Sequence, residues 1–485
     1  MKLGELAGPE CRLPAEAADV EITGLSADSR EIRPGYLFAA LPGTAMNGAD
    51  FIPQAIERGA VAVLMPEEGD ASACPVPVVR AGDPRRALAL MAARFYPRQP
   101  TVIAAVTGTN GKTSVVSFLR QIWRGLGHSA ASLGTIGVDT PSGAIKLAHT
   151  TPDPVGLHAV IDRIAAEGVT HLAFEASSHG LQQRRLDGVR LAAAAFTNIS
   201  RDHLDYHATF EDYLQQKLRL FDTLLPEGAP VVVDSDEAGS DAVTRTAQAR
   251  HQRVISVGAQ GETLKLSGVE REGFSQRLAI ETGEGRFDVL LPLAGRFQVA
   301  NALVAAGLAV ACGEDAARVL PLLAQLKGAR GRLELVGHNA HGAPVFVDYA
   351  HTPDALRTAL ETLRPYASGR LAVVFGCGGD RDRGKRPEMG SVAASLADLV
   401  IVTDDNPRSE SPDAIRREIL AGAPDAREIG DRREAIAAAI AALGSGDLLL
   451  VAGKGHETGQ SVADRVLPFS DHDVIAQILE EGRRK

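Results

Sequence analysis

The chain has 485 residues, of which 45 % are hydrophobic and 23 % are charged. This length favours about three domains, and the composition excludes a largely disordered protein because it supplies enough apolar side chains for sizeable cores. Lys and Arg number 51 against 61 Asp and Glu, a net charge of −10. This balance argues against non-specific nucleic-acid binding, which requires a broad basic surface.

The four cysteines lie far apart and form no Cys-x-x-Cys pair, which is typical of a reducing compartment. The N-terminal sequence lacks the apolar segment of a signal peptide, and no stretch reaches the roughly 18 apolar residues of a membrane span. We therefore expect a soluble, cytoplasmic protein.

Short strands and turns with one helix are expected in the first hundred residues. The pattern predicts strands within 21–30 and 36–43, a helix at 52–59 and a strand at 60–66. Pro97 and Pro100 then precede a further strand, so we place a domain boundary between residues 98 and 99.

From residue 99 onward, β-type and helical segments alternate. Strands are expected at 102–106, 170–177, 192–198 and 230–234, and helices at 114–127 and 210–221. This rhythm favours a mainly parallel sheet covered by helices on both faces. Between 261 and 295 a two-residue alternation with Gly-rich turns predicts an antiparallel patch in the same domain, followed by helices at 298–313 and 315–328.

A Gly- and Arg-rich turn at 328–332 marks the second boundary, between residues 330 and 331. The strands expected after it, at 343–350, 371–379, 398–405 and 447–455, end in polar or Gly-rich loops, where open α/β sheets bind ligands. The predicted fold class is α/β with three domains: a small N-terminal α/β domain (1–98), a central P-loop-type, mainly parallel sheet (99–330) and a Rossmann-like C-terminal domain (331–485).

The strongest motif follows the strand at 102–106 and is the run Gly108-Thr109-Asn110-Gly111-Lys112-Thr113. Backbone N–H groups in such a turn and at a helix N-terminus bind phosphates. Lys112 adds positive charge, and the hydroxyl of Thr113 or Ser114 can bind Mg²⁺. The general P-loop pattern would place its first glycine at Val106, so the match to it is imperfect. A plain strand-to-helix turn is the alternative, but the Lys–Thr pair favours phosphate binding.

This run resembles the ATP site of the Mur ligase family, amide-bond-forming enzymes that include the folylpolyglutamate synthetases. The resemblance continues in the same order at Glu175, at residues 198–207, at Asn301 and at residues 348–354. It implies an ATP-dependent acid–amino-acid ligase, a peptide synthase. Such an enzyme activates a carboxylate as an acyl phosphate, lets an amine attack it and releases ADP and phosphate.

Within the family, residues 28–43, 150–153 and 405–408 resemble the members that join meso-2,6-diaminopimelate to the D-Glu of UDP-N-acetylmuramoyl-L-Ala-D-Glu (UDP-MurNAc-L-Ala-D-Glu). That reaction belongs to cytoplasmic peptidoglycan precursor synthesis, and so to cell-wall biogenesis, cell shape, cell division and the cell cycle. The resemblance implies ATP as co-substrate, Mg²⁺ as cofactor, no nucleic-acid or membrane partner, and a monomer. It assigns the UDP-sugar to residues 1–98, ATP to 99–330 and the amino acid to 331–485.

The resemblance implies that Lys112, Glu175, His203 and Lys217 are catalytic. It further implies that Thr113, Glu175, His203 and Lys217 bind Mg²⁺, with Lys217 modified to a carbamate (N6-carboxylysine). Taken alone, Glu175 could cap a helix and His203 could be a loop histidine. Lys217 lies at the edge of an apolar stripe on the helix at 210–221, and burial there favours a neutral amine that can take up CO₂. A lysine whose charge remains in water is the alternative.

Three sets of binding residues also follow from the resemblance. For ATP they are Gly108, Thr109, Asn110, Gly111, Lys112, Thr113, Ser114, Asn301, Arg332, Asp348 and His351. For the UDP-MurNAc-dipeptide they are Ala27, Ser29, Thr44, Ala45, Met46, His149, Thr150, Thr151, Ser177, Gln183 and Arg185. For diaminopimelate they are Arg381, Asp405, Asn406, Pro407, Arg408, Gly453 and Glu457.

In the last set, Arg408 and Arg381 suit the distal carboxylate of diaminopimelate, and Glu457 suits the neighbouring ammonium group. The alternatives without a binding role are a solvated surface loop for residues 177–185 and a solvated charge cluster for residues 381–386.

Other functions remain possible at this point. A lysine-adding ligase or a folylpolyglutamate synthetase would share the fold. The sequence DNPR at 405–408 argues against the first, and the pattern at 28–43 argues against the second. A regulatory P-loop NTPase is the alternative from another class, and it would hydrolyse ATP without either of the other two substrates.

Overall fold

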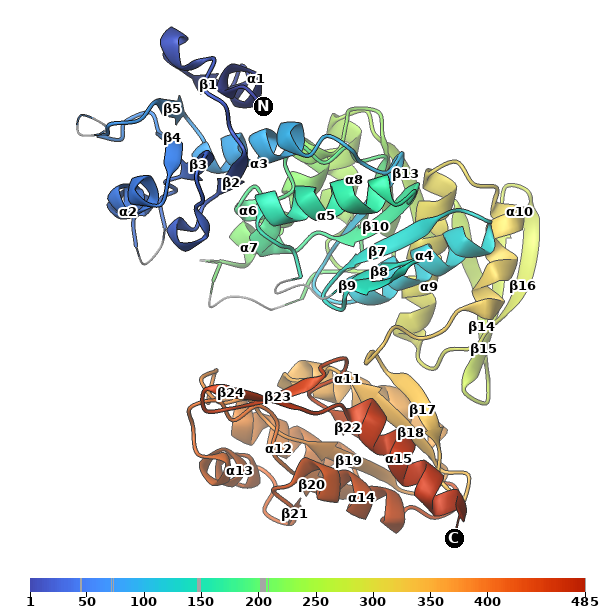
Figure 1. The fold of residues 1–485 in the computed structure, drawn as a ribbon. Helices are drawn as coiled ribbons and strands as arrows, with labels where there is room; N and C mark the ends of the chain where they lie inside the picture. The colour runs from blue at the N-terminus through green and yellow to red at the C-terminus, as the bar shows by residue number, and fades with distance from the viewer. Residues whose placement is uncertain are drawn as a thin grey trace. The chain divides into compact units, whose positions relative to one another are not determined.

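The computed structural model describes residues 1–43, 46–70, 72, 74–145, 150–200, 206–207 and 209–484. It contains three larger sheets, mostly parallel, with many helices (Figure 1), which confirms the α/β class. The chain divides into two compact units. The first is Met1–Leu266, Glu281–Gly285 and Leu303–Leu320, and the second is Ser267–Ile280, Arg286–Ala302 and Pro321–Lys485. Among the described residues, none of the helices combines the length and apolar composition that a membrane crossing needs.

The N-terminal part of the first unit contains a sheet with strand order β1-β5-β4-β3-β2, parallel except for the β1–β5 pair. Its strands are β1 (Cys11–Arg12), β2 (Gly24–Ser26), β3 (Tyr36–Ala39), β4 (Ala60–Pro66) and β5 (Val78–Ala81). Its α-helices are α1 (Leu3–Ala7), α2 (Ile52–Glu57) and α3 (Pro84–Phe95).

The expectation of one helix in this region was wrong, because α1 and α3 also form. The start of α3 has a readable signal. Asp83 accepts a hydrogen bond from Arg86 N, and Pro84 occupies the first turn, which is a common beginning for a helix. The buried side chains of α3 then recur at helical spacing.

The largest sheet has the order β16-β15-β14-β13-β12-β11-β6-β10-β7-β8-β9. Its pairs from β14 to β7 are parallel, and β8 and β9 add antiparallel pairs. Its strands are β6 (Val102–Thr107), β7 (Ala130–Gly134), β8 (Gly137–Thr140), β9 (Gly143–Ile145), β10 (His171–Glu175), β11 (Ala193–Phe196), β12 (Pro230–Asp234), β13 (Arg253–Gly258), β14 (Leu264–Glu272), β15 (Ser275–Thr282) and β16 (Gly285–Leu291). Every residue of β10 and β11 is buried, as expected for central strands of a parallel sheet covered on both faces.

Helices connect these strands. They are α4 (Lys112–Gly125), α5 (Pro154–Ala166), α6 (Ser178–Gln182), α7 (Phe210–Arg219), α8 (Ser240–Ala249), α9 (Arg296–Ala311) and α10 (Ala316–Val319). The helix expected at 315–328 is interrupted, since α10 gives way to a 3₁₀ segment, η5 (Leu320–Gln325). Pro321 lacks the N–H that would continue the α-helical hydrogen bonds. Beyond Arg219, α7 becomes a π-helical turn, η4 (Leu220–Leu224).

The second unit contains a sheet of order β17-β18-β22-β19-β20-β21, parallel except for β17–β18. Its strands are β17 (Glu334–His338), β18 (Pro344–Asp348), β19 (Leu371–Phe375), β20 (Leu399–Val402), β21 (Arg427–Glu428) and β22 (Leu448–Ala452), and β23 (Gly459–Val462) and β24 (Arg465–Pro468) form a separate hairpin. Its helices are α11 (Pro353–Leu363), α12 (Lys385–Leu396), α13 (Pro412–Leu420), α14 (Arg432–Ala442) and α15 (Asp471–Arg484). The loops after β18, β19, β20 and β22 share one sheet edge, as predicted.

A buried ion pair joins α14, α15 and β22. Arg432 Nε lies 2.7 Å from Asp471 Oδ1, with both side chains 0 % exposed, and Arg432 Nη2 donates to Ala452 O at 2.9 Å. Asp471→Ala leaves the guanidinium buried without its counter-ion, so we expect the free energy of unfolding in urea to fall by about 3–5 kcal/mol. The exposed Asp473→Ala on the same helix should cost less than about 1 kcal/mol. Equal losses in the two variants would contradict this assignment.

Candidate active site

The loop between β6 and α4 is held in shape by the end of β11. Thr109 N donates to Asn198 O at 2.8 Å, and Asn110 N donates to Asn198 Oδ1 at 3.0 Å. Gly108 has φ +147°, and a Cβ added there would lie 1.9 Å from Thr197 Oγ1. These contacts use the N–H groups of Thr109 and Asn110 and fix the loop that leads into the N-terminus of α4, the kind of helix end at which phosphates bind.

Gly108→Ala tests whether this shape matters. The added Cβ would force the loop away from Thr197, so we expect at least about tenfold weaker ATP binding, since overpacking costs about 1–3 kcal/mol. Gly127→Ala is the matched control, because Gly127 follows the same helix with φ +93° and an added Cβ there meets nothing within 4 Å. Calorimetric titration with ATP distinguishes the two, and similar affinities in both variants would show that the loop shape is unimportant.

Two lysine side chains meet at this loop. Lys112 Nζ donates to Gly108 O at 2.9 Å and to Thr109 O at 2.8 Å. Lys217 Nζ donates to the same Gly108 oxygen at 2.7 Å and lies 4.3 Å from the centre of the Tyr213 ring. Lys217 is only 1 % exposed. The alternative in which its charge remains in water is therefore wrong.

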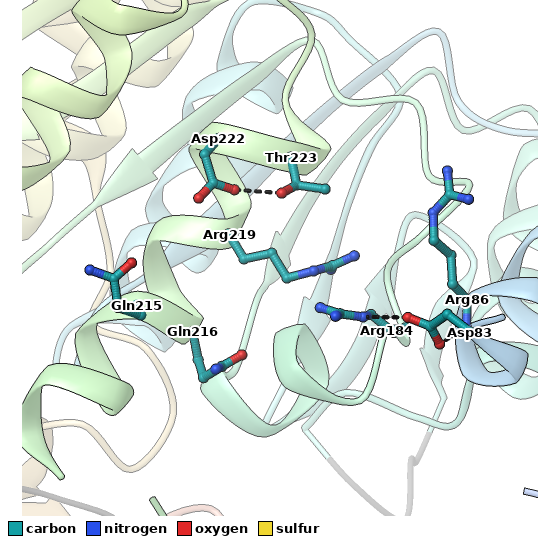
Figure 2. Close-up of a pocket in the computed structure, with 8 residues that line it drawn as sticks. All are labelled: Asp83, Arg86, Arg184, Gln215, Gln216, Arg219, Asp222 and Thr223. Carbon is teal, nitrogen blue, oxygen red and sulfur yellow. Dashed lines mark hydrogen bonds and ion pairs between the residues drawn. The ribbon is translucent and has the colours of Figure 1, made fainter.

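Helix α7, which carries Lys217, is anchored by Arg219. Arg219 Nη2 donates to Asp187 Oδ1 at 2.8 Å, and both side chains are buried. Arg184 binds Asp83 at 3.0 Å close by, and Figure 2 shows Arg184 and Arg219 side by side in a polar cavity. This cavity of about 370 Å³ is lined by Asp83, Arg86, Arg184, Gln215, Gln216, Arg219, Asp222 and Thr223. Sequence reasoning missed this anchor.

Glu175 lies at the carboxyl end of β10, beside β6, where it pairs with Val106. Its carboxylate accepts hydrogen bonds from Thr135 N at 2.9 Å and from Thr135 Oγ1 at 3.1 Å. Helix α6 is capped by Ser177, whose Oγ accepts from Gly180 N. Glu175 therefore does not cap that helix, and the alternative interpretation of Glu175 as a helix-capping carboxylate is wrong.

The chemistry of two described side chains fits a magnesium ion. The Thr113 hydroxyl and the Glu175 carboxylate, 7 % and 1 % exposed, are hard oxygen donors: Thr113 lies in the first turn of α4 after β6, and Glu175 is the last residue of the neighbouring β10. The predicted ligand His203 lies outside the described residues, as do Thr44, Ala45 and His149.

Five residues predicted to bind the dipeptide form one network. Thr150 Oγ1 contacts Thr135 Oγ1 at 3.1 Å, and Thr151 Oγ1 contacts Ser177 Oγ at 3.0 Å. Arg185 donates through Nη2 to Gln183 Oε1 at 2.7 Å and through Nη1 to Thr151 O. Because Thr135 also binds Glu175, the network extends to the end of β10. Burial lowers the pKa of Arg185, and the solvated-loop alternative for residues 177–185 does not hold.

Nearer the N-terminus, the structure describes three other residues assigned to the same ligand, Ala27, Ser29 and Met46, and none of these three is hydrogen-bonded to this network. Ser29 is buried and donates to Gln54 Oε1 at 2.6 Å, Ala27 is exposed, and Met46 is 67 % exposed.

In the second unit, the predicted ATP residues cluster around the turn before β17. Asp348 accepts hydrogen bonds from Leu333 N at 2.6 Å and from Ala350 N at 2.7 Å. Burial raises the pKa of Asp348, against the opposing charge of Arg332. The Arg332 guanidinium lies 4.8 Å from the centre of the Tyr349 ring, which in turn contacts the His351 ring at 4.6 Å.

Asn301 is linked to the same turn by hydrogen bonds through Gln298. Its Nδ2 donates to Gln298 Oε1 at 3.3 Å, and Gln298 Nε2 donates to Arg332 O at 3.3 Å. The structure therefore connects Asn301, Arg332, Asp348 and His351.

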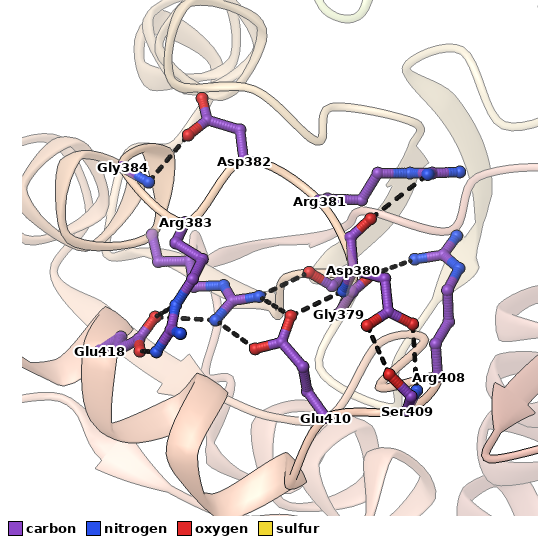
Figure 3. Close-up of polar contacts among 12 residues, drawn as sticks. Gly379, Asp380, Arg381, Asp382, Arg383, Gly384, Arg408, Ser409, Glu410 and Glu418 are labelled. Atoms are coloured by element: carbon purple, nitrogen blue, oxygen red, sulfur yellow. Dashed lines mark hydrogen bonds and ion pairs between the residues drawn. The ribbon is translucent and has the colours of Figure 1, made fainter. Parts of the chain in front are cut away.

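The loops after β19 and β20 hold the predicted arginines (Figure 3). Arg408 has φ +50°, and its Nη1 donates to Gly379 O at 2.8 Å. Asp380 accepts from Ser409 N at 3.1 Å and from Ser409 Oγ at 2.6 Å, which fixes one loop against the other. A Cβ added to Gly378 would lie 2.8 Å from Arg408 Nη1 and 3.8 Å from Arg381 Cγ. Both arginines therefore border the same loop.

The basic run at 381–386 is only partly solvated. Arg381 and Arg383 are exposed, but Arg386 is 0 % exposed and binds Glu410 at 2.8 Å and Glu418 at 2.7 Å. The Arg386 guanidinium holds the pKa of Glu410 at about 2. Arg386 thus fixes the loop behind Arg408, a role that sequence reasoning missed.

The other residues predicted to bind the amino acid meet where the loop after β20 approaches the loop after β22. Asn406 Nδ2 donates to Glu457 Oε2 at 2.8 Å, and Pro407 is buried beside them. Gly453, with φ +110°, packs so closely that an added Cβ would lie 2.6 Å from Asp405 Oδ2. Burial raises the pKa of Asp405.

A second cluster of metal-binding residue types lies at the other end of β10. His128 Nε2 lies 2.6 Å from Glu314 Oε1, and the His171 and His128 rings are 4.0 Å apart with an angle of 28° between them. Burial lowers the pKa of His171 to about 4. Rings stacked face to face do not direct their in-plane nitrogen lone pairs toward one point, so we assign this cluster to packing.

Comparisons with known proteins cover nearly all of the chain. Three family models match: "Mur ligase family, catalytic domain" at residues 21–96, "Mur ligase middle domain" at 106–309 and "Mur ligase, glutamate ligase domain" at 331–455. The chain is 57 % identical to a UDP-N-acetylmuramoyl-L-alanyl-D-glutamate–2,6-diaminopimelate ligase of Bradyrhizobium diazoefficiens, over 99 % of each chain. It is 54 % identical to the relative of the same name in Mesorhizobium japonicum, again over 99 % of each. A solved structure with that name is similar over 100 % of both chains, with 31 % identity and a TM-score of 0.73.

Proposed function

The chain belongs to the Mur ligase family, and we propose that it joins meso-2,6-diaminopimelate to the D-Glu carboxylate of UDP-MurNAc-L-Ala-D-Glu. The observation that carries this proposal is the 57 % identity over 99 % of both chains to a relative named for that reaction. The grouping of Arg381, Arg408 and Glu457 at one sheet edge supports the choice of amino acid.

ATP is the proposed co-substrate and is cleaved to ADP and phosphate. The loop and the first turn of α4, residues 108–114, bind its phosphates, and Lys112, which donates to loop carbonyls in this structure, turns its charge to them. Asn301, Arg332, Asp348 and His351 are assigned to the same nucleotide. When bound, Mg²⁺ would neutralise phosphate charge, held by Thr113, Glu175, His203 and the carbamate of Lys217.

The surroundings of Lys217 support its conversion to a carbamate. Its amine is buried, and it shares the Gly108 oxygen with Lys112. Burial and a second ammonium group both disfavour a charged amine. The neutral amine attacks CO₂ and forms an N–C bond, and one proton is released, so that the uncharged amine becomes an anionic carbamate beside the loop at 108–113.

The dipeptide occupies the network that ends at Glu175 in this proposal. Arg185 has a planar guanidinium that suits a carboxylate or phosphate, and Thr150, Thr151, Ser177 and Gln183 supply further donors. The D-Glu carboxylate attacks the γ-phosphorus of ATP and becomes an acyl phosphate, with ADP as the leaving group. Charge neutralisation and positioning are the main requirements of this step.

Diaminopimelate then supplies the attacking amine. Its nitrogen forms the amide bond, phosphate leaves, and holding both reactants in place removes much of the entropic cost. Arg408 and Arg381 bind the distal carboxylate, and Glu457 binds the ammonium group on the same carbon. Lysine lacks this carboxylate and would leave the arginines without a counter-ion.

We also propose the division into domains 1–98, 99–330 and 331–485, each with one reactant, and a monomeric enzyme in the cytoplasm. All four cysteines are free in the structure, which agrees with a reducing compartment. The reaction would serve peptidoglycan precursor synthesis, and through it cell-wall biogenesis, cell shape and division.

Phosphate release with single omissions tests this function. We expect release only when ATP, Mg²⁺, UDP-MurNAc-L-Ala-D-Glu and diaminopimelate are all present, with lysine a poor substitute. A regulatory NTPase would release phosphate without the dipeptide and the amino acid, and a lysine-adding ligase would prefer lysine. Either result would overturn the proposal.

A further inference from the structure

A buried lysine with no role in the mechanism above lies beneath the amino-acid site. Lys454 follows β22, and its side chain is 0 % exposed. Its Nζ donates to Asn406 Oδ1 at 3.2 Å, to Glu457 Oε2 at 2.9 Å and to Gly459 O at 2.7 Å. An ammonium group has three donors, and these three acceptors use all of them. Lys454 therefore ties together the loop after β20, the loop after β22 and the start of β23.

We propose that Lys454 is a positioning residue, which fixes Glu457 and Asn406 so that Glu457 receives the ammonium group of the amino-acid substrate. Oε2 of Glu457 already accepts from Lys454 and from Asn406 Nδ2, at 2.9 and 2.8 Å. None of the hydrogen bonds among the described residues uses Oε1, and the side chain is 31 % exposed. We therefore assign Oε1 to the ammonium group of the substrate. This inference rests on the proposed function, because it places the amino acid at Glu457.

Lys454 also fixes the orientation of the Asn406 side-chain amide. Its Oδ1 accepts from Lys454 Nζ at 3.2 Å and from Ser461 N at 2.9 Å. Its Nδ2 is thereby directed toward Glu457. Without the ammonium group, the Glu457 carboxylate would keep only the Asn406 donor and could turn away from the site.

The positive charge of Lys454 also affects the pKa of Glu457. Burial acts to raise the pKa of Glu457, but the charge of Lys454 and the hydrogen bonds from Asn406 and Lys454 outweigh it, so this pKa is lowered. The other titratable or charged groups facing Glu457 are His456, Asp405, Tyr349 and Arg432. A lowered pKa keeps Glu457 ionised as the pH falls. Removal of Lys454 should therefore move the acid limb of the pH profile to higher pH.

Lys454→Gln in the full-length enzyme tests the proposal. We expect the KM for diaminopimelate to rise about 10- to 100-fold, while the KM values for ATP and UDP-MurNAc-L-Ala-D-Glu stay unchanged. The acid limb of kcat/KM for diaminopimelate should move up by about one pH unit. Lys454→Arg keeps the charge and should move the limb less. Lys265→Gln, at an exposed lysine of β14, is the control and should change neither quantity.

The outcomes separate this inference from the function on which it rests. If the wild-type enzyme does not ligate diaminopimelate, the proposed function fails. If it does, and Lys454→Gln retains both the wild-type KM and the wild-type acid limb, the positioning role is overturned. Circular dichroism checks folding, and Lys454→Met provides a second neutral variant if the first does not fold.

Discussion

Lys217→Ala is expected to lower the rate of ligation by about 1,000-fold, the scale on which enzymes lose activity when one fixed charge at the reacting group is removed. Lys217 is buried against the phosphate loop, with Nζ 2.7 Å from Gly108 O. Alanine can neither bind that oxygen nor become a carbamate. Added bicarbonate should therefore not restore activity to this variant, and steady-state phosphate release measures the loss.

A control variant and a spectroscopic measurement make this test specific. Gln215→Ala, at an exposed residue of the same helix, should retain wild-type turnover. Carbon-13 NMR of protein equilibrated with labelled bicarbonate should show a carbamate signal in the wild-type protein that is absent from Lys217→Ala. Turnover of Lys217→Ala within tenfold of the wild type would contradict the assigned role.

Arg408→Ala is expected to lower kcat/KM for diaminopimelate by about 100-fold or more, because the partly buried Arg408 is proposed to bind the distal carboxylate and loss of one partner of a hydrogen-bonded charge pair costs about 2–5 kcal/mol. The guanidinium of Arg408 is placed by Gly379 O and by a backbone in the left-handed region. ATP binding should be unaffected, and the preference for diaminopimelate over lysine should largely disappear. Competition between the two amino acids, followed by mass spectrometry of the product, measures that preference.

Arg427→Ala, at an exposed arginine of β21 in the same unit, controls for a general loss of positive charge. It should leave the preference for diaminopimelate intact. An Arg408→Ala enzyme that still prefers diaminopimelate as strongly as the wild type would remove Arg408 from the recognition of the distal carboxylate.

Local signals in the sequence predicted the α/β class and central strands of each large sheet, but not strands such as β5, β7, β13 and β17. A buried apolar strand followed by a Gly-rich turn and a Lys–Thr pair predicts a phosphate-binding loop from a few residues, as at 102–113. In the second unit, β18, β19, β20 and β22 were predicted because each is an apolar run that ends in a polar or Gly-rich loop, whereas β17, β21 and the β23–β24 hairpin were not. Helix α3 was missed although its Asp83–Pro84 start was readable.

Contacts between residues far apart in the chain could not be predicted in this way. The anchor of α7 depends on Arg219 meeting Asp187, and the loop behind Arg408 depends on Arg386 meeting Glu410. Neither pair has a characteristic spacing. Lys454 was missed for the same reason, because a lysine between two glycines looks like part of a solvated loop until its burial is known.

Transfer of oxygen from the dipeptide to phosphate is the most direct test of the proposed acyl-phosphate intermediate. The enzyme would be supplied with UDP-MurNAc-L-Ala-D-Glu carrying ¹⁸O in the reacting D-Glu carboxylate, together with ATP, Mg²⁺ and diaminopimelate. An acyl phosphate leaves one carboxylate oxygen on the phosphate, so the released phosphate should contain one ¹⁸O atom for each amide bond formed. Release of unlabelled phosphate would contradict the account.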